Sequence, residues 1–393
     1  MNTFDLIATT QFGLEEILAA ELKALGAENT EILNRAVKFT GTLELLYKSN
    51  YLLRTCLKIL KPIATFEAYN ETQLYENIKK IDWSQYLTLQ QTFAIDGTTS
   101  GEVFTHSKFV ALKSKDAIVD QFRENCGVRP SVDPEDPDIR INIHISDINC
   151  SVSIDSTGVP LNKRGYRLEQ TFAPISEVLA AGIILLSGWD RKTDFYDPMC
   201  GSGTFSIEAA LLAQNIPNGQ LRKFLFEKWS NFDAILWQTI KDEAEKAIIP
   251  FEGNIYATDL DKNAIEISLQ NARRAGVAAN IEFAEADFLQ SKVKGEGGLI
   301  VMNPPYNERL KNDDIVEFYS ELGTHLKHFY NGCDAWIISG NLEALKFIGL
   351  RPSRKIKLYN GQLECRLQKY ELYRGSKRGG NDPLQIISPT SRR

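Results

Sequence analysis

The stretch that decides the fold is Asp197-Pro198-Met199-Cys200-Gly201-Ser202-Gly203-Thr204, which lies between a strand predicted at residues 194–197 and a helix predicted at residues 205–213. Its glycines let the backbone turn sharply and let a ligand approach without meeting a side chain. The order strand, glycine loop, helix is typical of an α/β domain that binds a small molecule at the loop.

The carboxylate of Asp197 narrows the choice of that ligand. At the end of a strand it would repel a diphosphate and attract an ammonium group. The ammonium of S-adenosylmethionine is therefore favoured over a nicotinamide dinucleotide, and the absence of a full Gly-x-Gly-x-x-Gly pattern points the same way. We expect this stretch to contact the cofactor through Asp197, Pro198, Gly201, Gly203 and Thr204.

A second acidic residue, Asp259, ends the strand predicted at residues 254–259. A carboxylate in this place usually accepts ribose hydroxyls, and the alternative is that it caps the helix predicted at residues 263–275. It comes much later than the spacing of about 20 residues in a bare βαβ unit. Residues 215–253 are therefore predicted to form an inserted, partly helical piece.

A third pair, Asp287-Phe288, follows the strand predicted at residues 281–284. We expect Asp287 to accept the adenine amino group and the Phe288 ring to pack against the purine face. Together with the first two sites, this order of carboxylates predicts a complete S-adenosylmethionine pocket.

The most specific motif is Asn303-Pro304-Pro305-Tyr306, after the apolar strand predicted at residues 298–302. The Asn303 side-chain oxygen and the Pro304 carbonyl could each accept one hydrogen of an exocyclic base amine. These bonds would aim the nitrogen lone pair at the methyl group and stabilise charge developing on nitrogen. Pro305 helps to fix the loop, and Tyr306 could stack on an extruded base. The alternative is a rigid turn whose tyrosine only packs.

The two halves of the chain meet near residue 160 and follow different patterns. The first half alternates short strands and helices as a small α+β unit does, and the second alternates strand and helix as a mostly parallel sheet does. The tail is rich in Gly, Pro, Ser and Arg, which predicts disorder. The predicted divisions are residues 1–60 for an N-terminal unit, 61–157 for a second unit, 158–173 for a linker, 174–375 for the α/β domain and 376–393 for a disordered tail.

Composition limits the class of protein. The net charge is −6, which argues against a protein that coats nucleic acid non-specifically, although a local basic face remains possible. The first residues do not form a signal peptide, and the longest apolar run, residues 178–186, is too short to span a bilayer. The six cysteines are scattered, so we expect a cytoplasmic protein without a metal site, disulfides or membrane association.

The three motifs in this order resemble those of the class I amino-methyltransferases and, more closely, of the THUMP-domain RNA guanine-N2 methyltransferases that act on 23S ribosomal RNA. Further stretches that carry the resemblance are residues 161–167 (LNKRGYR), 222–229 (RKFLFEKW), 303–310 (NPPYNERL) and 360–367 (NGQLECRL). The resemblance implies an α/β Rossmann-like class I methyltransferase domain preceded by an α+β ferredoxin-like and THUMP RNA-binding module. One departure is Asn307, where the family often has glycine.

The expected partner is RNA, most of all 23S ribosomal RNA or a precursor of the large ribosomal subunit, with transfer RNA as the alternative. Basic residues of one predicted helix and of the linker are the candidates for contacting it. The alternative is a solvated helix face for the helix residues and an interdomain structural role for the linker residues. These candidates are Lys108, Lys113, Lys115, Lys163, Arg164, Tyr166 and Arg167.

Three other functions remain as alternatives. A DNA adenine-N6 methyltransferase shares the Asn-Pro-Pro-Tyr motif, but no stretch of this chain resembles a DNA target-recognition domain. A non-catalytic RNA-binding or ribosome-assembly factor would have no reason to keep both Asp197 and the motif at Asn303. A nicotinamide dehydrogenase is disfavoured by Asp197.

Overall fold

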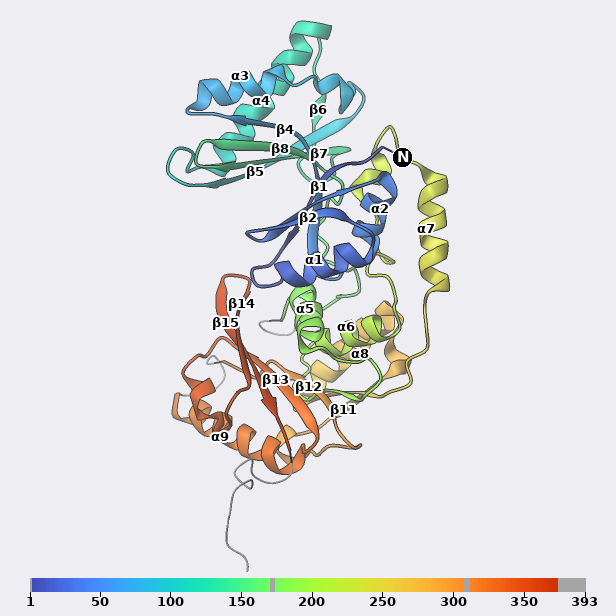
Figure 1. The fold of residues 1–393 in the computed structure, drawn as a ribbon, viewed down its shortest axis with the longest axis vertical. Helices are drawn as coiled ribbons and strands as arrows, with labels where there is room; N and C mark the ends of the chain where they lie inside the picture. Colours follow the sequence, from blue (N-terminus) through green and yellow to red (C-terminus); the bar gives the residue numbers. More distant parts are fainter. Residues whose placement is uncertain (1, 170–173, 307–311, 374–393) are drawn as a thin grey trace, which may run out of the picture.

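The computed structural model describes residues 2–169, 174–306 and 312–373. The molecule is elongated, with two N-terminal modules stacked end to end above an α/β domain (Figure 1). The predicted disordered tail, Asn307 and part of the linker lie outside the described residues. Within the described residues, no helix combines the length and the apolar character needed to cross a membrane.

The first module is a βαββαβ unit, the ferredoxin-like arrangement. Its helices pack on one face of an antiparallel sheet, and Thr42 begins the second helix by accepting a hydrogen bond from the Leu45 amide. Its elements are β1 (Phe4–Thr10), α1 (Glu15–Ala24), β2 (Glu28–Leu33), β3 (Ala36–Gly41), α2 (Leu43–Leu52) and β4 (Cys56–Glu67).

The long strand β4 joins this module to the next. Its first residues pair with β1 and its later residues pair with β8, so one eight-stranded sheet runs through both modules in the order β2-β3-β1-β4-β8-β7-β5-β6. The predicted boundary at residues 60 and 61 falls inside this strand. The second module contains α3 (Glu71–Lys80), η1 (Trp83–Gln85), β5 (Thr92–Ser100), α4 (Ser107–Cys126), β6 (Ser131–Val132), β7 (Ile139–Ser146) and β8 (Asn149–Asp155).

The α/β domain has a seven-stranded sheet in the order β11-β10-β9-β12-β13-β15-β14. Its first five strands are parallel and β15 is antiparallel, with α5, α6 and α8 on one face and α9 on the other. Its elements are α5 (Glu177–Ser187), β9 (Phe195–Asp197), α6 (Thr204–Ala213), η2 (Leu225–Lys228), α7 (Ala234–Lys246), β10 (Ile255–Asp259), α8 (Lys262–Ala275), η3 (Ala278–Asn280), β11 (Ile281–Glu285), η4 (Phe288–Gln290), β12 (Gly298–Met302), α9 (Asn312–Phe329), β13 (Cys333–Ser339), η5 (Ala344–Ile348), β14 (Arg354–Asn360) and β15 (Leu363–Glu371).

This strand order confirms the predicted α/β Rossmann-like class and places the functional site. From β9 the chain first moves outward through β10 and β11, and then returns to place β12 on the other side of β9. Ligands of open α/β sheets bind outside the carboxyl ends of the strands at such a switch point. We therefore expect the ligand-binding site at the carboxyl ends of β9, β10 and β12.

The predicted insertion, residues 215–253, reaches back to the first module. Its helix α7 lies alongside α2 (Figure 1), and its aromatic side chains join the core of the ferredoxin-like unit. The Phe226 ring stacks on Tyr47 with centroids 4.2 Å apart, and Trp237 meets Tyr51 edge-on at 5.1 Å. The α/β domain thus supplies part of the core of the first module.

We predict that Tyr47→Phe lowers the free energy of unfolding by about 1 kcal/mol, because it removes the hydroxyl that accepts the Asp233 amide at 3.1 Å. Urea denaturation measures the change. Tyr51→Phe is the matched control, since the Tyr51 hydroxyl makes no hydrogen bond within the described residues. Equal destabilisation by the two substitutions would contradict this role of Tyr47.

Candidate active site

The glycine loop connects β9 to α6 in a shape that requires its glycines. Gly201 and Gly203 have φ values of 53° and 80°, in the left-handed region. A Cβ on Gly203 would lie 2.8 Å from the Cβ of Ser268 on α8, so only glycine allows this approach. Gly201 is half-buried, whereas Ser202, Gly203 and Thr204 are buried against the domain. Pro198 is buried beneath the loop.

Asp197 is the main electrostatic feature of the site. Its carboxyl group is fully buried, and Oδ2 accepts hydrogen bonds from the Ser206 amide at 3.2 Å and the Ser206 hydroxyl at 2.6 Å. Oδ1 is also buried, but it has no hydrogen-bond partner in the described part of the chain. Burial is the main cause that raises the pKa of Asp197 to about 7, and the nearby charge of Asp259 contributes in the same direction against the lowering effect of the Ser206 hydrogen bonds. An ammonium group at Oδ1 would supply the missing partner.

Asp259 lies at the end of β10, where it stabilises the loop from the neighbouring strand. Its Oδ2 accepts the Gly201 amide at 2.9 Å, and its Oδ1 accepts the Asp261 amide at 3.0 Å. The alternative that Asp259 caps the following helix is wrong, because Asp261 is the cap and accepts the Asn263 amide at 2.9 Å. Asp259 is half-buried, so it remains accessible to ribose hydroxyls.

The third predicted pair behaves differently from the expectation. Asp287 begins the short helix η4 and accepts the Leu289 amide at 2.9 Å, but it stays half-exposed. Phe288 is only 3% exposed and stacks on Tyr330 in the core beneath α9. The prediction that Phe288 packs against the purine is wrong, because its ring is already enclosed by protein.

Leu260 is a residue that the sequence analysis missed. It follows Asp259 directly and its side chain is 72% exposed. Its exposed apolar side chain lies beside Asp259, the candidate acceptor of the ribose hydroxyls, and offers the apolar surface that the buried Phe288 does not. The signal that could have identified it is an apolar residue between two aspartates, Asp259 and Asp261.

The motif Asn303-Pro304-Pro305-Tyr306 leaves the carboxyl end of β12, the strand that pairs with β9. The Tyr306 hydroxyl donates to the Asn303 Oδ1 atom. An amide oxygen has a second lone pair, so Asn303 can also accept a hydrogen from an incoming amine. The Pro304 ring is buried, and burial raises the pKa of Tyr306, so its hydroxyl remains protonated as a donor.

Two residues that the sequence analysis missed hold this motif in place. The Tyr319 hydroxyl on α9 donates to the Pro305 carbonyl at 3.3 Å and is 2.7 Å from the Ser339 hydroxyl at the end of β13. The Asn341 side chain donates through Nδ2 to the Tyr306 carbonyl at 3.1 Å. Neither position carries a local sequence signal, because tyrosine in a helix and asparagine in a loop are ordinary.

Three family models cover most of the chain. The RMKL-like methyltransferase domain matches residues 164–369, the THUMP domain matches residues 68–155, and the RlmL ferredoxin-like domain matches residues 5–60. The chain belongs to the RMKL-like family of THUMP-domain RNA methyltransferases. The resemblance drawn from the motifs and the predicted ferredoxin-like and THUMP modules are confirmed.

Individual relatives agree with the family. A "Putative RNA methyltransferase" of Synechocystis sp. is 39% identical over 95% of this chain and 98% of its own length. The "Ribosomal RNA large subunit methyltransferase K/L" of Psychromonas ingrahamii is 40% identical over 92% of this chain and 49% of its own length. The chain thus spans about half the length of the K/L protein that it matches.

A solved structure supports the cofactor assignment. The crystal structure of "a putative methyltransferase complexed with SAH" superposes with a TM-score of 0.87, with 31% identity, and covers 96% of this chain and 100% of that one. With the family, the glycine loop and the unpartnered Asp197 oxygen, this RMKL-like chain is an S-adenosylmethionine-dependent methyltransferase, as predicted.

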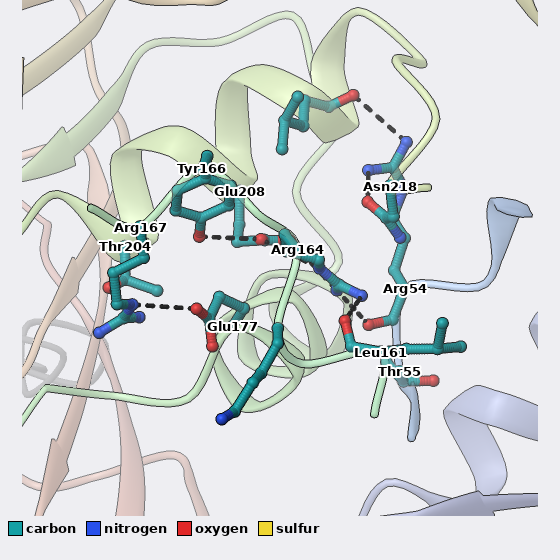
Figure 2. Close-up of polar contacts among 12 residues, drawn as sticks. Arg54, Thr55, Leu161, Arg164, Tyr166, Arg167, Glu177, Thr204, Glu208 and Asn218 are labelled. Atoms are coloured by element: carbon teal, nitrogen blue, oxygen red, sulfur yellow. Dashed lines mark hydrogen bonds and ion pairs between the residues drawn. The ribbon is translucent and has the colours of Figure 1, made fainter. Parts of the chain in front are cut away.

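The linker residues of this methyltransferase require a correction. Arg164 and Tyr166 are 2% and 1% exposed, and both donate to the buried Glu208 carboxylate of α6 (Figure 2). The prediction that they contact RNA is wrong, because their polar groups are buried and bonded within the protein. Arg167 is mostly buried and also turns inward, while Lys163 is exposed. The alternative, an interdomain structural role, is confirmed for Arg164, which also donates to the Arg54 carbonyl of the first module, whereas the hydrogen bonds of Tyr166 and Arg167 stay within the α/β domain.

The lysines predicted on one helix are indeed carried by α4 of the RMKL-like chain. Lys108 is exposed at its first turn. The Lys113 ammonium lies 5.3 Å from the centre of the Tyr75 ring, and Lys115 pairs with Asp116 at 2.7 Å. All three lie at least partly in solvent, so contact with phosphates remains a proposal.

Proposed function

We propose that this chain transfers a methyl group from S-adenosylmethionine to the exocyclic N2 amine of a guanine in 23S ribosomal RNA. The observation that carries this proposal is the place of Asn303. It follows β12 directly, and β12 pairs with β9, whose end carries Asp197 and the glycine loop. An amine acceptor and a cofactor pocket thus share one edge of the sheet. The K/L relative, which is named as a ribosomal RNA methyltransferase, supports the choice of RNA.

The residues of the pocket divide the work of holding the cofactor. When bound, S-adenosylmethionine supplies an activated methyl group. Asp197 would pair with its ammonium through the free Oδ1 atom, and Asp259 would accept its ribose hydroxyls. Asp287 would accept the adenine amino group, and the exposed Leu260 would cover the adenine ring.

The residues of the Asn-Pro-Pro-Tyr motif act on the base. A guanine amine is a poor nucleophile because its lone pair is delocalised into the ring. Asn303 Oδ1 and the Pro304 carbonyl would each accept one amine hydrogen, which orients the nitrogen and stabilises positive charge on it. The Tyr306 ring offers a surface on which an extruded base could stack. No strong base is required nearby, because the proton can leave to water after transfer.

RNA would be held by the N-terminal modules and by the exposed face of the linker. THUMP-type recognition rests on shape and phosphate contacts more than on sequence. Lys108, Lys113, Lys115 and Lys163 are the residues that we propose for phosphate contact, because each is at least partly exposed.

The test is methyl transfer from labelled S-adenosylmethionine into unmodified total RNA, followed by digestion to nucleosides and identification by mass. We expect label in N2-methylguanosine, recovered from 23S RNA or from precursors of the large ribosomal subunit. Label confined to transfer RNA would replace ribosomal RNA by the alternative substrate. No label in either RNA or in assembly precursors, from protein that binds the cofactor, would favour a non-catalytic assembly factor.

A further inference from the structure

We infer that Arg167 and Asn271 are positioning residues of the cofactor loop, and that the linker between the RNA-binding modules and the catalytic domain sets the shape of that loop. The inference rests on the cofactor site and not on which base is methylated. The sequence of the linker predicted a contact with RNA and gave no sign of this role in S-adenosylmethionine binding.

Arg167 holds the first residue of α6. Its Nη2 atom donates to the Thr204 hydroxyl at 3.0 Å and to the Ile175 carbonyl at 2.9 Å, and its Nε atom donates to Glu177 at 2.9 Å (Figure 2). Thr204 follows Gly203 directly, and its side chain is buried. One guanidinium therefore joins the linker, the start of α5 and the end of the glycine loop.

Asn271 makes a second, independent connection on the other side of Gly203. Its side chain is 1% exposed on α8, and its Nδ2 atom donates to the Ser202 carbonyl at 3.0 Å and to the Glu169 carbonyl at 3.2 Å. Its Oδ1 atom accepts the Leu168 amide at 2.9 Å. The linker is thus tied to the residues immediately before and after Gly203.

The same linker is also fixed to the first module. Arg164 donates to the Arg54 carbonyl at 2.6 Å and to both oxygens of Glu208, one turn into α6. Arg54 in turn donates to the Asn218 side chain at 3.0 Å and to the Leu211 carbonyl near the end of α6 at 3.2 Å (Figure 2). Helix α6 is therefore bonded near its start by Arg164 and near its end by Arg54. Arg54 belongs to the N-terminal module, and Arg164 is bonded to it, so both contacts require that module to be docked.

These contacts matter for the cofactor because glycines form the turn, so a ligand at the loop would meet backbone and not flexible side chains. A backbone site cannot adjust through side-chain rotamers, so its affinity depends on how well the surrounding bonds fix it. Replacing Arg167 by a neutral residue would also leave the buried Glu177 carboxylate without its ion-pair partner. The expected consequence is weaker cofactor binding with the fold retained.

The test is the binding of S-adenosylhomocysteine to the full chain without RNA, measured by titration calorimetry. We expect Arg167→Gln and Asn271→Ala each to raise its Kd about tenfold. Thr204→Val should do the same, and combining it with Arg167→Gln should add little, because both changes remove the bond between Arg167 and the Thr204 hydroxyl. In steady-state assays the KM for S-adenosylmethionine should rise while kcat at saturation stays near that of the wild type.

Arg222→Gln is the matched control. Arg222 also donates to linker carbonyls, those of Val159, Pro160 and Lys163, but it does not contact α6. The Kd of Arg222→Gln for S-adenosylhomocysteine should change by about twofold or less, because this variant loosens the linker without removing a bond to the glycine loop. Arg167→Lys keeps the charge with fewer donors, and should give an intermediate Kd even if Arg167→Gln folds poorly.

Two results would overturn the inference: unchanged affinity in Arg167→Gln and Asn271→Ala, or equal weakening by Arg222→Gln. A wild-type chain that binds S-adenosylhomocysteine but methylates no guanine would refute the proposed substrate and leave this inference intact. A wild-type chain that binds no S-adenosylhomocysteine would overturn the cofactor site and the inference with it.

Discussion

Replacing Asn303 by alanine is expected to lower kcat for methyl transfer by about 10²–10³-fold, in the range found when one preorganised hydrogen-bonding group is lost from a transition state. The side chain would interact with the amine and not with the cofactor, so the Kd for S-adenosylhomocysteine should stay within about twofold of wild type. Single-turnover transfer into RNA and calorimetric titration measure the two quantities.

Tyr306→Phe provides the matched control for this change. It removes the hydroxyl that bonds Asn303 but keeps the ring that could stack on the base, so we expect a loss of kcat below about tenfold. The assignment of Asn303 as the amine acceptor would be refuted if Asn303→Ala kept more than about a tenth of wild-type kcat.

Cofactor binding through Asp197 is expected to depend on pH. Its carboxyl group has a pKa raised by burial to about 7, so the free protein carries this group largely neutral below that pH. Only the charged form attracts an ammonium strongly. We expect the Kd for S-adenosylhomocysteine to rise as pH falls from about 7.5 to 5.5, approaching tenfold per unit well below the pKa.

Asp197→Asn should raise this Kd about 100-fold at pH 7.5, because the ion pair to the ammonium is lost in a buried site. The variant should also lose the dependence on pH. Calorimetry across the pH range compares it with the wild type. A flat wild-type profile, or a variant that binds as tightly as the wild type, would contradict the assignment of Asp197.

Protein stability gives a separate readout of the same group. The pKa of Asp197 in the folded protein is raised above its ordinary value of 3.8, so the folded state holds this proton more tightly than the unfolded state does. The resulting gain in folding stability is complete below pH 3.8 and is lost as the pH rises through about 7. Asp197→Asn should therefore not lower the thermal midpoint of the free protein at pH 8. A drop in that midpoint would show that the charged carboxylate stabilises the empty fold.

Most of the catalytic domain could be predicted because its signals are local. The glycine loop, the apolar strand before Asn303 and the acidic strand ends each lie within a few residues, and the strand order brings them to one edge of the sheet. In the first module, β2 carries no sequence signal of a strand, because its side chains are almost all exposed and show no alternation. The strand β4 is hard to predict from sequence because Pro62 interrupts its pattern, and its pairing register with β8 shifts between Pro62 and Ala64.

The errors at the site share a cause, which is that burial is not a local property. Phe288 and Leu260 occupy similar places after strand ends, yet one is enclosed under α9 and the other is exposed. Arg164, Tyr166 and Lys163 form one basic and aromatic run, yet only Lys163 faces solvent. The role of each depends on which distant element packs on it.

The sequence by itself determined the chemistry of this protein: a carboxylate at Asp197, a backbone that can turn at Gly201 and Gly203, and an amide at Asn303 after an apolar strand. These properties belong to the residue types and survive in any arrangement that keeps the strand order. Only the tertiary structure decided that Asp261 caps α8, that the insertion completes the first module, and that Arg167 turns inward to Thr204. The contacts of Arg167 and of the insertion are made with residues more than thirty positions away, which a local sequence pattern does not reveal. The choice of cap lay between two neighbouring aspartates, Asp259 and Asp261, which a local pattern does not distinguish.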